Sequence, residues 1–507
     1  MTHRTPDPVP KPLDHLACRG ERSAMALVDR AGSLDHAGLD TLVGVLAAAL
    51  LAQGLAPGDR IATWLSKNRI ACLMPLAAAR AGLIHVPINP LLKHGQAAHI
   101  LADSGAGLLI SNRGRAETIE TADRPAGCRL LLEDEEGEAL LSGDTPLPPS
   151  CWDPATLTAI LYTSGSTGRP KGVMLSHANL WLGAVSVAHY LDLRDDDRVL
   201  ALLPLSFDYG QNQLLSAWAA GGCAYPLDYL VPRDVPKAVA RHGITTLAGV
   251  PPLWIQLADI DWPPEAVAPL RRLTNTGGRM SIGLVRRLRG LFPEARLFSM
   301  YGLTEAFRST YLDPALIDAH PDSIGTEIPF AEVMVVRPDG RLAADGEPGE
   351  LVHAGPLVAQ GYWRDPDRTA ERFRPAPAAA RHGGTAVWSG DTVVRDAAGL
   401  LRFVGRDDEM IKSAGNRISP TEIEEAAMAS GAASEAVAIG VPDERLGQAI
   451  LLYACQSGAG ADERLRDWFK RNLPSFMQPA RVIWRDELPR NANGKLDRAA
   501  LKAEVMR

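Results

Sequence analysis

The segment Thr163–Gly172 has the residue types that bind a phosphate group. Its glycines allow the backbone to approach an anion closely, and its hydroxyl and backbone N–H groups can donate hydrogen bonds to phosphate oxygens. Arg169 and Lys171 add positive charge. Because Lys171 precedes Gly172 instead of following a glycine, the segment is not a Walker loop, which excludes a P-loop kinase. We expect a phosphate-binding loop, the alternative being a flexible turn, between a strand at 158–162 and a helix capped by Ser176.

Four more short motifs follow this loop along the chain and carry polar side chains suited to nucleotide chemistry. Each is weak by itself: Asp391, after a turn, would ordinarily be a solvated cap, and Lys495, beside Asn493-Gly494, an exposed hairpin lysine. Their order behind the loop makes them informative as a set. The motifs are Tyr301-Gly302-Leu303-Thr304-Glu305, Ser389-Gly390-Asp391, Gly405–Glu424 and Pro489–Leu496.

The loop and the four motifs resemble those of the AMP-forming adenylate superfamily, which contains acyl-CoA synthetases, peptide-synthetase adenylation domains and luciferases. Order and spacing match from about residue 20 to the end of the chain. The resemblance implies a ligase that works in two steps. ATP and a carboxylate form an acyl-adenylate and pyrophosphate, and a thiol then displaces AMP. ATP, Mg²⁺ and either CoA or phosphopantetheine would be its cofactors.

The resemblance also implies roles for single residues. Lys495 would bridge the carboxylate and the α-phosphate, Thr304 would contact the α-phosphate, and Glu305 would hold Mg²⁺; these three would be catalytic. Tyr301 would stack on adenine, and Asp391 would accept both ribose hydroxyls. The full set expected to contact ATP or AMP is Thr163, Ser164, Gly165, Ser166, Thr167, Gly168, Lys171, Gly277, Gly278, Arg279, Tyr301, Gly302, Asp391 and Arg406.

A substrate pocket is expected around Asp208. The pair Phe207-Asp208 resembles the adenylation domains in which this aspartate binds the α-ammonium of an amino acid. A buried carboxylate is costly unless it is paired, so Asp208 needs such a substrate or Arg308; if Arg308 neutralises it, the amino-acid inference fails. An amino acid is favoured over another polar acid, and a fatty acid comes last. The expected pocket residues are Phe207, Asp208, Tyr209, Asn212 and Arg308.

Two stretches, Ser206–Gly210 and Thr304–Tyr311, resemble more narrowly the acyl-CoA ligases associated with exosortase A, which lie in bacterial exopolysaccharide gene clusters. Stand-alone prolyl-carrier-protein ligases are a neighbouring group. The acceptor thiol therefore stays open between CoA and the phosphopantetheine of a separate acyl or peptidyl carrier protein. A fatty or aryl acyl-CoA synthetase, a luciferase-like oxygenase and a catalytically silent homologue are the alternatives; retention of Lys495, Glu305 and Asp391 argues against the last.

Composition excludes several other classes of protein. The chain has 507 residues, 46% of them hydrophobic, and 53 Lys and Arg against 60 Asp and Glu give a net charge of −7, so no nucleic-acid partner is expected. Six cysteines without a Cys-x-x-Cys pair argue against a zinc ribbon or disulfide framework. The start lacks the apolar stretch of a signal peptide, and residues 42–52, the longest uncharged apolar run, are too short to span a bilayer. We therefore expect a soluble cytoplasmic protein without a membrane span.

Short apolar strands that alternate with helices predict an α/β fold with parallel sheets. A boundary is expected near Arg406, between an AMP-binding body, 1–406, and a small mobile α+β domain, 407–507, that carries Lys495. A helix at 42–51 is expected to begin at Asp40 or Thr41. Other elements are expected as strands at 60–65, 84–88, 107–110, 199–203, 297–301, 437–441 and 450–454 and as helices at 71–81, 420–429 and 462–472.

The small domain must present two different segments to one active site. Lys495 would serve adenylation, whereas Lys412, Gly415 and Arg417 are expected on the thiol side of the site. Because Lys495 lies about eighty residues beyond Gly415, we expect a rotation about a hinge, for which Asp408 is the matching position. The segment Ser419-Pro420-Thr421-Glu422 further predicts a capping box at the start of the domain's first helix.

Overall fold

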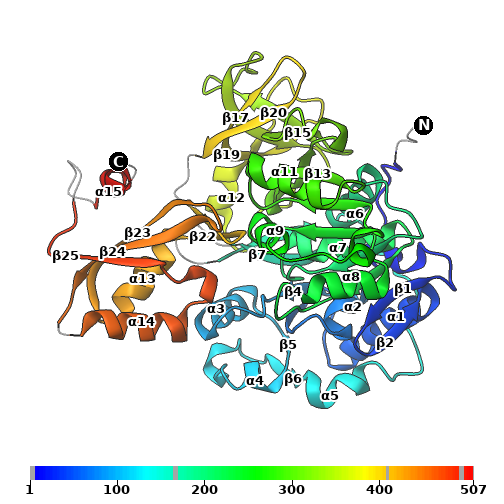
Figure 1. The fold of residues 1–507 in the computed structure, drawn as a ribbon. Coiled ribbons are helices and arrows are strands. Elements are labelled where there is room, and N and C mark those ends of the chain that lie inside the picture. Colours follow the sequence, from blue (N-terminus) through cyan, green and yellow to red (C-terminus); the bar gives the residue numbers. More distant parts are fainter. Residues whose placement is uncertain (1–5, 164–169, 407–409, 459, 490–495, 506–507) are drawn as a thin grey trace.

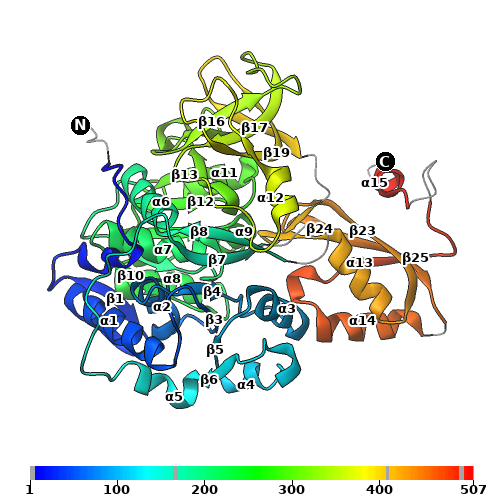
Figure 2. The same cartoon turned by 180° about the vertical axis from the view of Figure 1, so that it is seen from behind.

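The computed structural model describes residues 6–163, 170–406, 410–458, 460–489 and 496–505. A large body of β-sheets and flanking helices carries a small domain at one side, coloured orange and red (Figures 1 and 2). The expected α/β body with a small α+β domain is confirmed.

The first sheet of the body has six strands in the order β6-β5-β3-β4-β7-β8. Five are parallel, and β8 pairs antiparallel to β7, with Thr163 opposite Lys171. The chain between these two residues is the predicted phosphate-binding loop. The elements are β3 (Arg60–Trp64), β4 (Ile84–Pro87), β5 (Leu108–Ser111), β6 (Arg129–Leu132), β7 (Leu157–Thr163), β8 (Lys171–Ser176), α2 (Arg69–Arg80), α3 (His94–Ser104), α4 (Arg113–Ala116) and α5 (Glu133–Leu140).

The second sheet is parallel over β10-β9-β11-β12-β13, and β1 and β2 extend it beyond β10. The inner strands β9, β11 and β12 are short and almost entirely buried, as expected for a sheet covered on both faces. The bounds of the strands are β1 (Met25–Asp29), β2 (Gly32–Asp35), β9 (Arg198–Ala201), β10 (Cys223–Pro226), β11 (Thr246–Gly249), β12 (Arg272–Asn275) and β13 (Arg296–Leu303). The helices are α1 (His36–Ala52), α6 (His177–Tyr190), α7 (Asp208–Ala219), α8 (Asp234–His242), α9 (Pro251–Ala258), α10 (Pro264–Val267) and α11 (Ile282–Leu291).

Beyond β13 the second sheet continues antiparallel, in the order β14-β15-β20-β19-β17-β16, with β18 beside β19. This part forms the top of the molecule in Figure 1. The elements are β14 (Phe307–Tyr311), β15 (Ser323–Glu327), β16 (Glu332–Val336), β17 (Pro348–Ala354), α12 (Pro366–Arg372), β18 (Phe373–Pro375), β19 (Thr385–Arg395) and β20 (Leu401–Arg406). Short 3₁₀ turns are Leu13–Cys18, Thr121–Asp123, Thr304–Ala306, Pro314–Leu316 and Ser475–Met477.

The small domain has a five-stranded sheet and its own apolar core. The sheet runs β22-β21-β24-β23, with β25 parallel to β24, and the core gathers around Ile423, Leu452 and Phe469. Its elements are β21 (Ile411–Ser413), β22 (Asn416–Ile418), α13 (Pro420–Ala429), β23 (Ala433–Asp443), β24 (Gly447–Gln456), α14 (Ala461–Asn472), β25 (Arg481–Arg485) and α15 (Arg498–Val505).

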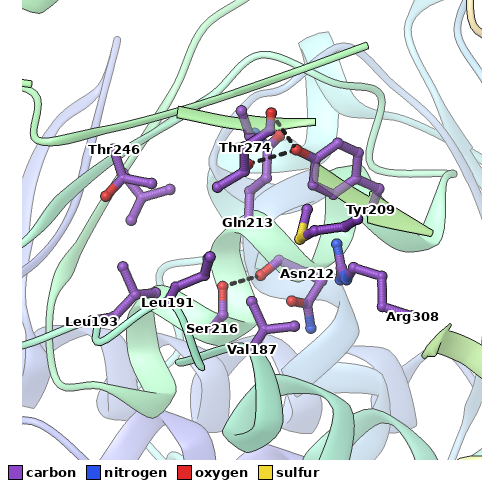
Figure 3. Close-up of a pocket in the computed structure, with 13 residues that line it drawn as sticks. Val187, Leu191, Leu193, Tyr209, Asn212, Gln213, Ser216, Thr246, Thr274 and Arg308 are labelled. Carbon is purple, nitrogen blue, oxygen red and sulfur yellow. Dashed lines mark hydrogen bonds between the residues drawn. The ribbon is translucent and has the colours of Figure 1, made fainter. Parts of the chain in front are cut away.

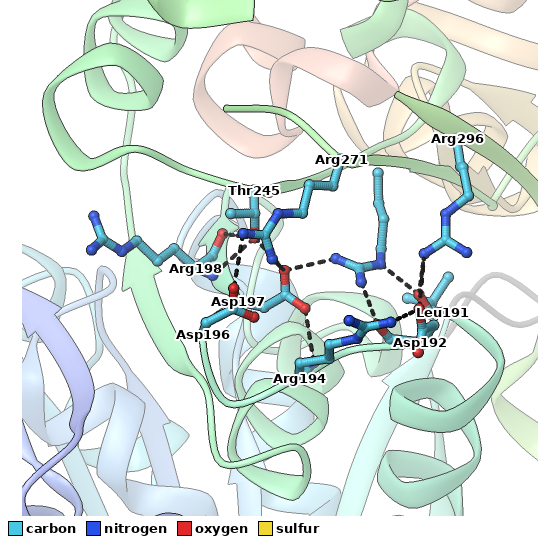
Figure 4. A network of polar contacts seen from close by, with 10 residues as sticks. Leu191, Asp192, Arg194, Asp196, Asp197, Arg198, Thr245, Arg271 and Arg296 are labelled. Carbon is cyan, nitrogen blue, oxygen red and sulfur yellow. Dashed lines mark hydrogen bonds and ion pairs between the residues drawn. The ribbon is translucent and has the colours of Figure 1, made fainter. Parts of the chain in front are cut away.

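A buried ion network ties together the amino ends of parallel strands in the second sheet (Figure 4). Arg272, the first residue of β12, and Thr245, which precedes β11, each donate to Asp197 Oδ1 at 2.7 Å. Nε and Nη2 of Arg272 donate to the carbonyl oxygens of Leu191 and Asp192. All three guanidinium nitrogens are therefore hydrogen bonded, at the strand ends opposite to those where ligands bind in such sheets.

Two local predictions were wrong. The first helix begins at His36, earlier than expected, because Asp35 caps it by accepting from the Gly38 N–H at 2.7 Å. The capping box of α13 does not form: Ser419 makes no side-chain cap. Glu422, which should have completed the box, instead accepts from Gln96 of α3 at 3.3 Å. Tertiary contact with the body thus replaces a local cap.

The small domain contacts the body through two described segments. The Gln96 side chain donates both to Glu422 and to the Asn472 carbonyl, at 3.4 Å. The turn between β21 and β22 packs on the residue before α9, since a Cβ added at Gly415 would lie 2.8 Å from a Val250 methyl carbon. Among the described residues, the helices lack the length and apolar character that a membrane span requires.

Candidate active site

The candidate site lies at the carboxyl ends of the parallel strands β11, β12 and β13, beside the β7–β8 hairpin. Val250 follows β11, Gly277-Gly278 follows β12 and Thr304-Glu305 follows β13. In a parallel sheet these ends meet at one edge, where ligands bind. The predicted motifs therefore converge because the strands that precede them are neighbours.

Lys171 and Glu305 form a buried ion pair at the centre of the site. Lys171 Nζ donates to Glu305 Oε1 at 2.9 Å, and the Tyr362 hydroxyl donates to the same oxygen at 2.7 Å. Lys171 also lies 3.9 Å from the centre of the Tyr362 ring and donates to its hydroxyl. Tyr362 was not predicted, because its segment, Gln360–Trp363, lacks the charged or glycine-rich pattern of a nucleotide motif.

The charges in this cluster keep Glu305 ionised. Burial by itself would raise the pKa of Glu305, whose side chain is 1% exposed, but Lys171 and Arg417 lie close enough to outweigh burial and hold that pKa well below its usual range. Burial lowers the pKa of Lys171, an effect that Glu305 opposes. A carboxylate kept ionised in this way suits a divalent metal bound together with phosphate.

Tyr301 and Asp391 meet between β13 and β19. The Tyr301 hydroxyl donates to Asp391 Oδ2, and the Asp391 N–H donates to Ser389 Oγ at 3.1 Å. His353 of β17 stacks beside Tyr301, with ring centres 6.1 Å apart and an interplanar angle of 16°. Burial lowers the pKa of His353 to about 3, so its ring is neutral at physiological pH. His353 was also missed, because a lone histidine in a strand has no distinguishing sequence signal.

The glycines Gly277 and Gly278 and the side chain of Arg279 lie after β12. Gly277 has φ +77°, a left-handed conformation that favours glycine. Asn275 fixes the segment by donating to the Gly278 carbonyl at 3.0 Å, and Arg279 is exposed. Gly277 also faces the small domain, because a Cβ added there would lie 3.8 Å from the Gly415 carbonyl oxygen.

A strained turn separates the second motif from the substrate cavity. Phe307 has φ +57°, which is unusual for a bulky residue and stores backbone strain. The turn folds β14 back on β13, so that Arg308 pairs with Gly302. The chain thereby brings Arg308 beside the motif that contains Glu305.

A small cavity of about 20 Å³ lies next to this turn (Figure 3). Three of the five predicted pocket residues line it: Tyr209 and Asn212 of α7, and Arg308. The other two, Phe207 and Asp208, precede and begin α7 and are half-buried. The remaining wall is mostly apolar and consists of Val187, Leu191, Leu193, Val199, Ala248 and Met300, with Gln213, Ser216, Thr246 and Thr274.

Asp208 is close to charges of both signs but forms no ion pair with a described residue. Burial raises the pKa of Asp208; Arg308 lowers it without cancelling that effect, and Glu305 raises it further. Within the described part of the chain, the expected alternative of an Asp208–Arg308 ion pair is therefore absent. The shift favours the neutral form of Asp208, and a cation bound beside it would favour the carboxylate.

The small domain turns the segment Lys412–Arg417 toward the body. Gly415 packs on Val250, and Arg417 is near enough to Glu305 to lower its pKa. Lys412 lies 5.1 Å from the centre of the Phe403 ring. Several predicted residues lie outside the description: Ser164, Gly165, Ser166, Thr167, Gly168, Asp408, Lys495 and the side chain of Arg406.

Comparison with known protein families assigns the chain to one of them. AMP-binding enzymes match residues 15–363, and the AMP-binding enzyme C-terminal domain matches residues 422–495. The chain belongs to the AMP-binding enzyme family. The resemblance predicted from the motifs is confirmed at this level, and the AMP-binding enzyme described here is an AMP-forming ligase of the acid–thiol class.

Relatives of this AMP-binding enzyme cover nearly the whole chain. It is 35% identical over 488 residues to a feruloyl-CoA synthase of Amycolatopsis sp, with 94% of both chains covered. It is 31% identical over 494 residues to the L-proline–[L-prolyl-carrier protein] ligase of Pseudomonas fluorescens, covering 95% of this chain and 96% of the relative. A solved double mutant of o-succinylbenzoate CoA synthetase from Bacillus subtilis superposes with a TM-score of 0.84 at 26% identity, covering 97% and 98%.

Proposed function

We propose that this AMP-binding enzyme activates a small polar carboxylic acid, an amino acid being favoured, and transfers it to the thiol of CoA or of a carrier protein's phosphopantetheine. One observation carries the proposal: Asp208 lies within electrostatic reach of both Glu305, in the cluster suited to polyphosphate, and Arg308, which lines the small cavity. Among the acids named for the relatives, proline is an amino acid and supports the favoured class, whereas ferulate and o-succinylbenzoate are aryl acids and correspond to the alternative.

In this proposal the phosphates of ATP lie between the Thr163–Lys171 loop and Glu305. The described residues contain no cluster of three or more acidic, histidine or cysteine side chains, so Glu305 together with phosphate oxygens would hold Mg²⁺, as is usual for this ion. Bound Mg²⁺ supplies charge neutralisation at those oxygens. Asp391, already oriented by Tyr301, would accept the ribose hydroxyls, and Thr304 would contact the α-phosphate.

The two half-reactions would use different faces of the small domain. The position of Gly415 against Val250, with Arg417 near Glu305, supports a role for Lys412, Gly415 and Arg417 on the thiol side. Lys495 would serve adenylation after a rotation about Asp408. A domain that used one fixed arrangement for both steps would contradict this part of the proposal.

The test is pyrophosphate release with MgATP over a panel of amino acids, short polar acids, aryl acids and fatty acids. Thioester is then measured with CoA and with a phosphopantetheinylated carrier protein. We expect release with small polar acids, and loss of release in Lys495→Ala by about a hundredfold, the scale for removing one electrostatic stabiliser. Release with fatty or aryl acids alone would favour that alternative, and no release with any acid would indicate a catalytically silent homologue.

The amino-acid part of the proposal depends on Asp208. If an α-ammonium pairs with this half-buried carboxylate, Asp208→Ala should lower amino-acid activation about tenfold or more, because the ammonium loses its charge partner. Binding of MgATP should stay unchanged. Full amino-acid activity in the variant would remove the amino-acid part and leave another polar acid as the substrate.

The narrower assignment to the exosortase A-associated acyl-CoA ligases is also part of the proposal, together with a cytoplasmic location. Its support is the sequence of Ser206–Gly210 and Thr304–Tyr311. Genes for exopolysaccharide synthesis beside the gene for this chain would support it. A gene neighbourhood without such genes would contradict it and leave the ligase activity untouched.

A further inference from the structure

Arg308 is a buried cation without a polar partner. Its side chain is 2% exposed, and Nε and Nη2 have no hydrogen-bond partner among the described residues. Its contacts are with rings, because the guanidinium lies 4.9 Å from the Tyr209 ring centre and 4.7 Å from that of Phe307. Burying a charge is costly unless it is paired and hydrogen bonded. The stability of the ligand-free protein therefore does not account for Arg308.

The other buried arginines that the structure describes are fully partnered. Arg272, also 2% exposed, is bonded at all three guanidinium nitrogens and faces Asp197. Arg80 pairs with Asp14 and Asp40 and donates to two carbonyl oxygens. Arg308 is the exception among these three, and it is the one that lines a cavity. The comparison indicates that its missing partner is a ligand.

Arg308 and Asn212 bring unpaired donors to one side of the cavity. Figure 3 shows the Arg308 guanidinium facing the side chain of Asn212. Asn212 is 1% exposed, and both its Nδ2 and Oδ1 are unpartnered within the described chain, as is Thr246 Oγ1. A planar group with two oxygens suits this arrangement, because guanidinium binds carboxylate through two parallel hydrogen bonds and the Asn212 amide can donate a third.

The cavity limits the size of that group and its distance from the reacting end. A water needs about 10–15 Å³, so about 20 Å³ suits a small terminal group and not an alkyl chain. Arg308 pairs across the strands with Gly302 of the second motif, and paired residues in antiparallel strands are about 5 Å apart. The backbone of Arg308 therefore lies beside the second motif, which favours a short acid over a long one.

We propose that Arg308, with Asn212, binds a second carboxylate of the substrate, so that the enzyme activates short dicarboxylic acids. This deepens the proposed function and rests on it. Asp208 does not compete for Arg308, since the two form no ion pair within the described residues. A short acid with an added α-ammonium, such as aspartate, would satisfy both residues.

Three four-carbon acids isolate the role of the far end of the substrate. Succinate ends in a second carboxylate, butyrate in a methyl group and 4-aminobutyrate in an ammonium. In pyrophosphate release with MgATP, kcat/KM of the wild type should be higher for succinate than for the other two by about 30-fold or more, because a site built for a polar group rejects analogues that lack it. Malonate, glutarate and aspartate extend the series in length and charge.

Variants of Arg308 then test whether this residue causes the preference for succinate. Arg308→Met should abolish the preference, chiefly by raising KM for succinate, because a ground-state contact is lost, and should leave butyrate within about threefold. Arg308→Lys should keep part of the preference. Arg374→Met is the matched control, since Arg374 also lies over a ring, that of Trp388 at 4.0 Å, but on β18, away from the cavity.

The outcomes separate this inference from the function on which it rests. If the wild type releases pyrophosphate equally fast with monocarboxylic acids and with every dicarboxylic acid of the series, the inference is overturned and the proposed function stays intact. The inference is also overturned if Arg308→Met keeps the preference for succinate. No release with any acid overturns the proposed function itself. The wild-type series decides the question even if Arg308→Met does not fold.

Discussion

Arg272 and Arg308 are equally buried, yet their surroundings are opposite. At the amino end of β12, Arg272 is bonded at all three guanidinium nitrogens and faces the carboxylate of Asp197. Near the carboxyl ends of the same sheet, Arg308 lies between two rings, and two of its nitrogens lack a partner in the described chain. One end of the sheet thus satisfies its charges internally, whereas the other leaves a charge for a ligand to satisfy.

The buried cluster of Lys171, Glu305 and Tyr362 is a third case between these two. Lys171 and Glu305 are paired with each other in the ligand-free protein, but both are also the groups proposed to bind phosphate and Mg²⁺. Binding there exchanges one set of partners for another, whereas binding in the cavity adds partners where none exist. Selectivity for the acid should therefore be sharper than selectivity for the nucleotide's phosphates.

The largest expected effect is a difference in stability between two arginine variants. Arg272→Met removes the main partner of the buried Asp197 and should lower the free energy of unfolding by about 3 kcal/mol. Arg308→Met replaces an unpaired charge by an apolar side chain and should change it by less than about 1 kcal/mol, or raise it. Urea denaturation of the ligand-free variants measures both. Equal losses would mean that Arg308 has a stabilising partner, and the comparison would fail.

The second prediction concerns the paired cluster of the active site. Glu305→Gln keeps the shape of the side chain but removes its charge, so pyrophosphate release should fall by about a hundredfold. Lys171 also loses its partner, so thermal stability should drop slightly. Glu332→Gln is the matched control, because Glu332 is equally buried and pairs with Arg381 away from the site. Release that stays above a tenth of the wild-type rate would remove Glu305 from its proposed role.

A third prediction makes the same comparison of a hydrogen-bonded and an unpartnered side chain for two buried asparagines. The Asn179 side chain donates to the carbonyl oxygens of Pro356 and Val358 and accepts from Ser176, so Asn179→Leu should cost about 2 kcal/mol of stability. Asn212→Leu breaks no described side-chain hydrogen bond and should cost less than about 0.5 kcal/mol, because Leu also favours helix. It should nevertheless weaken activation of succinate. Thermal melts and pyrophosphate release measure the two effects; a large melt shift in Asn212→Leu would contradict the assignment.

The smallest effect is expected at the contact between the small domain and the body, where the Glu422 carboxylate has only part of its hydrogen-bonding capacity filled. Burial raises the pKa of Glu422 to about 7, with the donor Gln96 lowering it and Glu425 raising it. The raised pKa means that Glu422 is protonated more readily when the small domain is docked on the body. Its stabilising contribution is complete below the ordinary pKa near 4.5 and is lost as pH rises through about 7.

Thioester formation from preformed acyl-AMP should therefore slow several-fold between pH 6 and pH 8, if the docked arrangement serves that step. Glu422→Gln should flatten this part of the profile, because the amide does not titrate, while Glu425→Gln should keep the transition and move it to lower pH. A profile that is identical in wild type and Glu422→Gln would show that docking does not depend on this proton.

Much of the fold and the motifs that converge at the candidate site could be predicted from the sequence, because those features depend on local pattern. Alternating apolar strands and helices indicated the parallel sheets, and Ser176 was correctly placed as a helix cap. Glycine, hydroxyl and charged residues in fixed order indicated the family. Where prediction failed, a distant residue competed with a local one, as when Gln96 took Glu422 away from the cap of α13.

The amino-acid sequence by itself determined the family, the order of the motifs and the reaction class, since these are encoded in residues that are neighbours along the chain. Only the tertiary structure decided which side chains become partners. Tyr362 joined Lys171 and Glu305 from a segment without a motif. The turn at Phe307 and the register of β14 on β13 placed Arg308 opposite Gly302, where it lines the cavity. Such pairings depend on distances of a few ångströms between elements far apart in sequence, which no local pattern of residue types specifies.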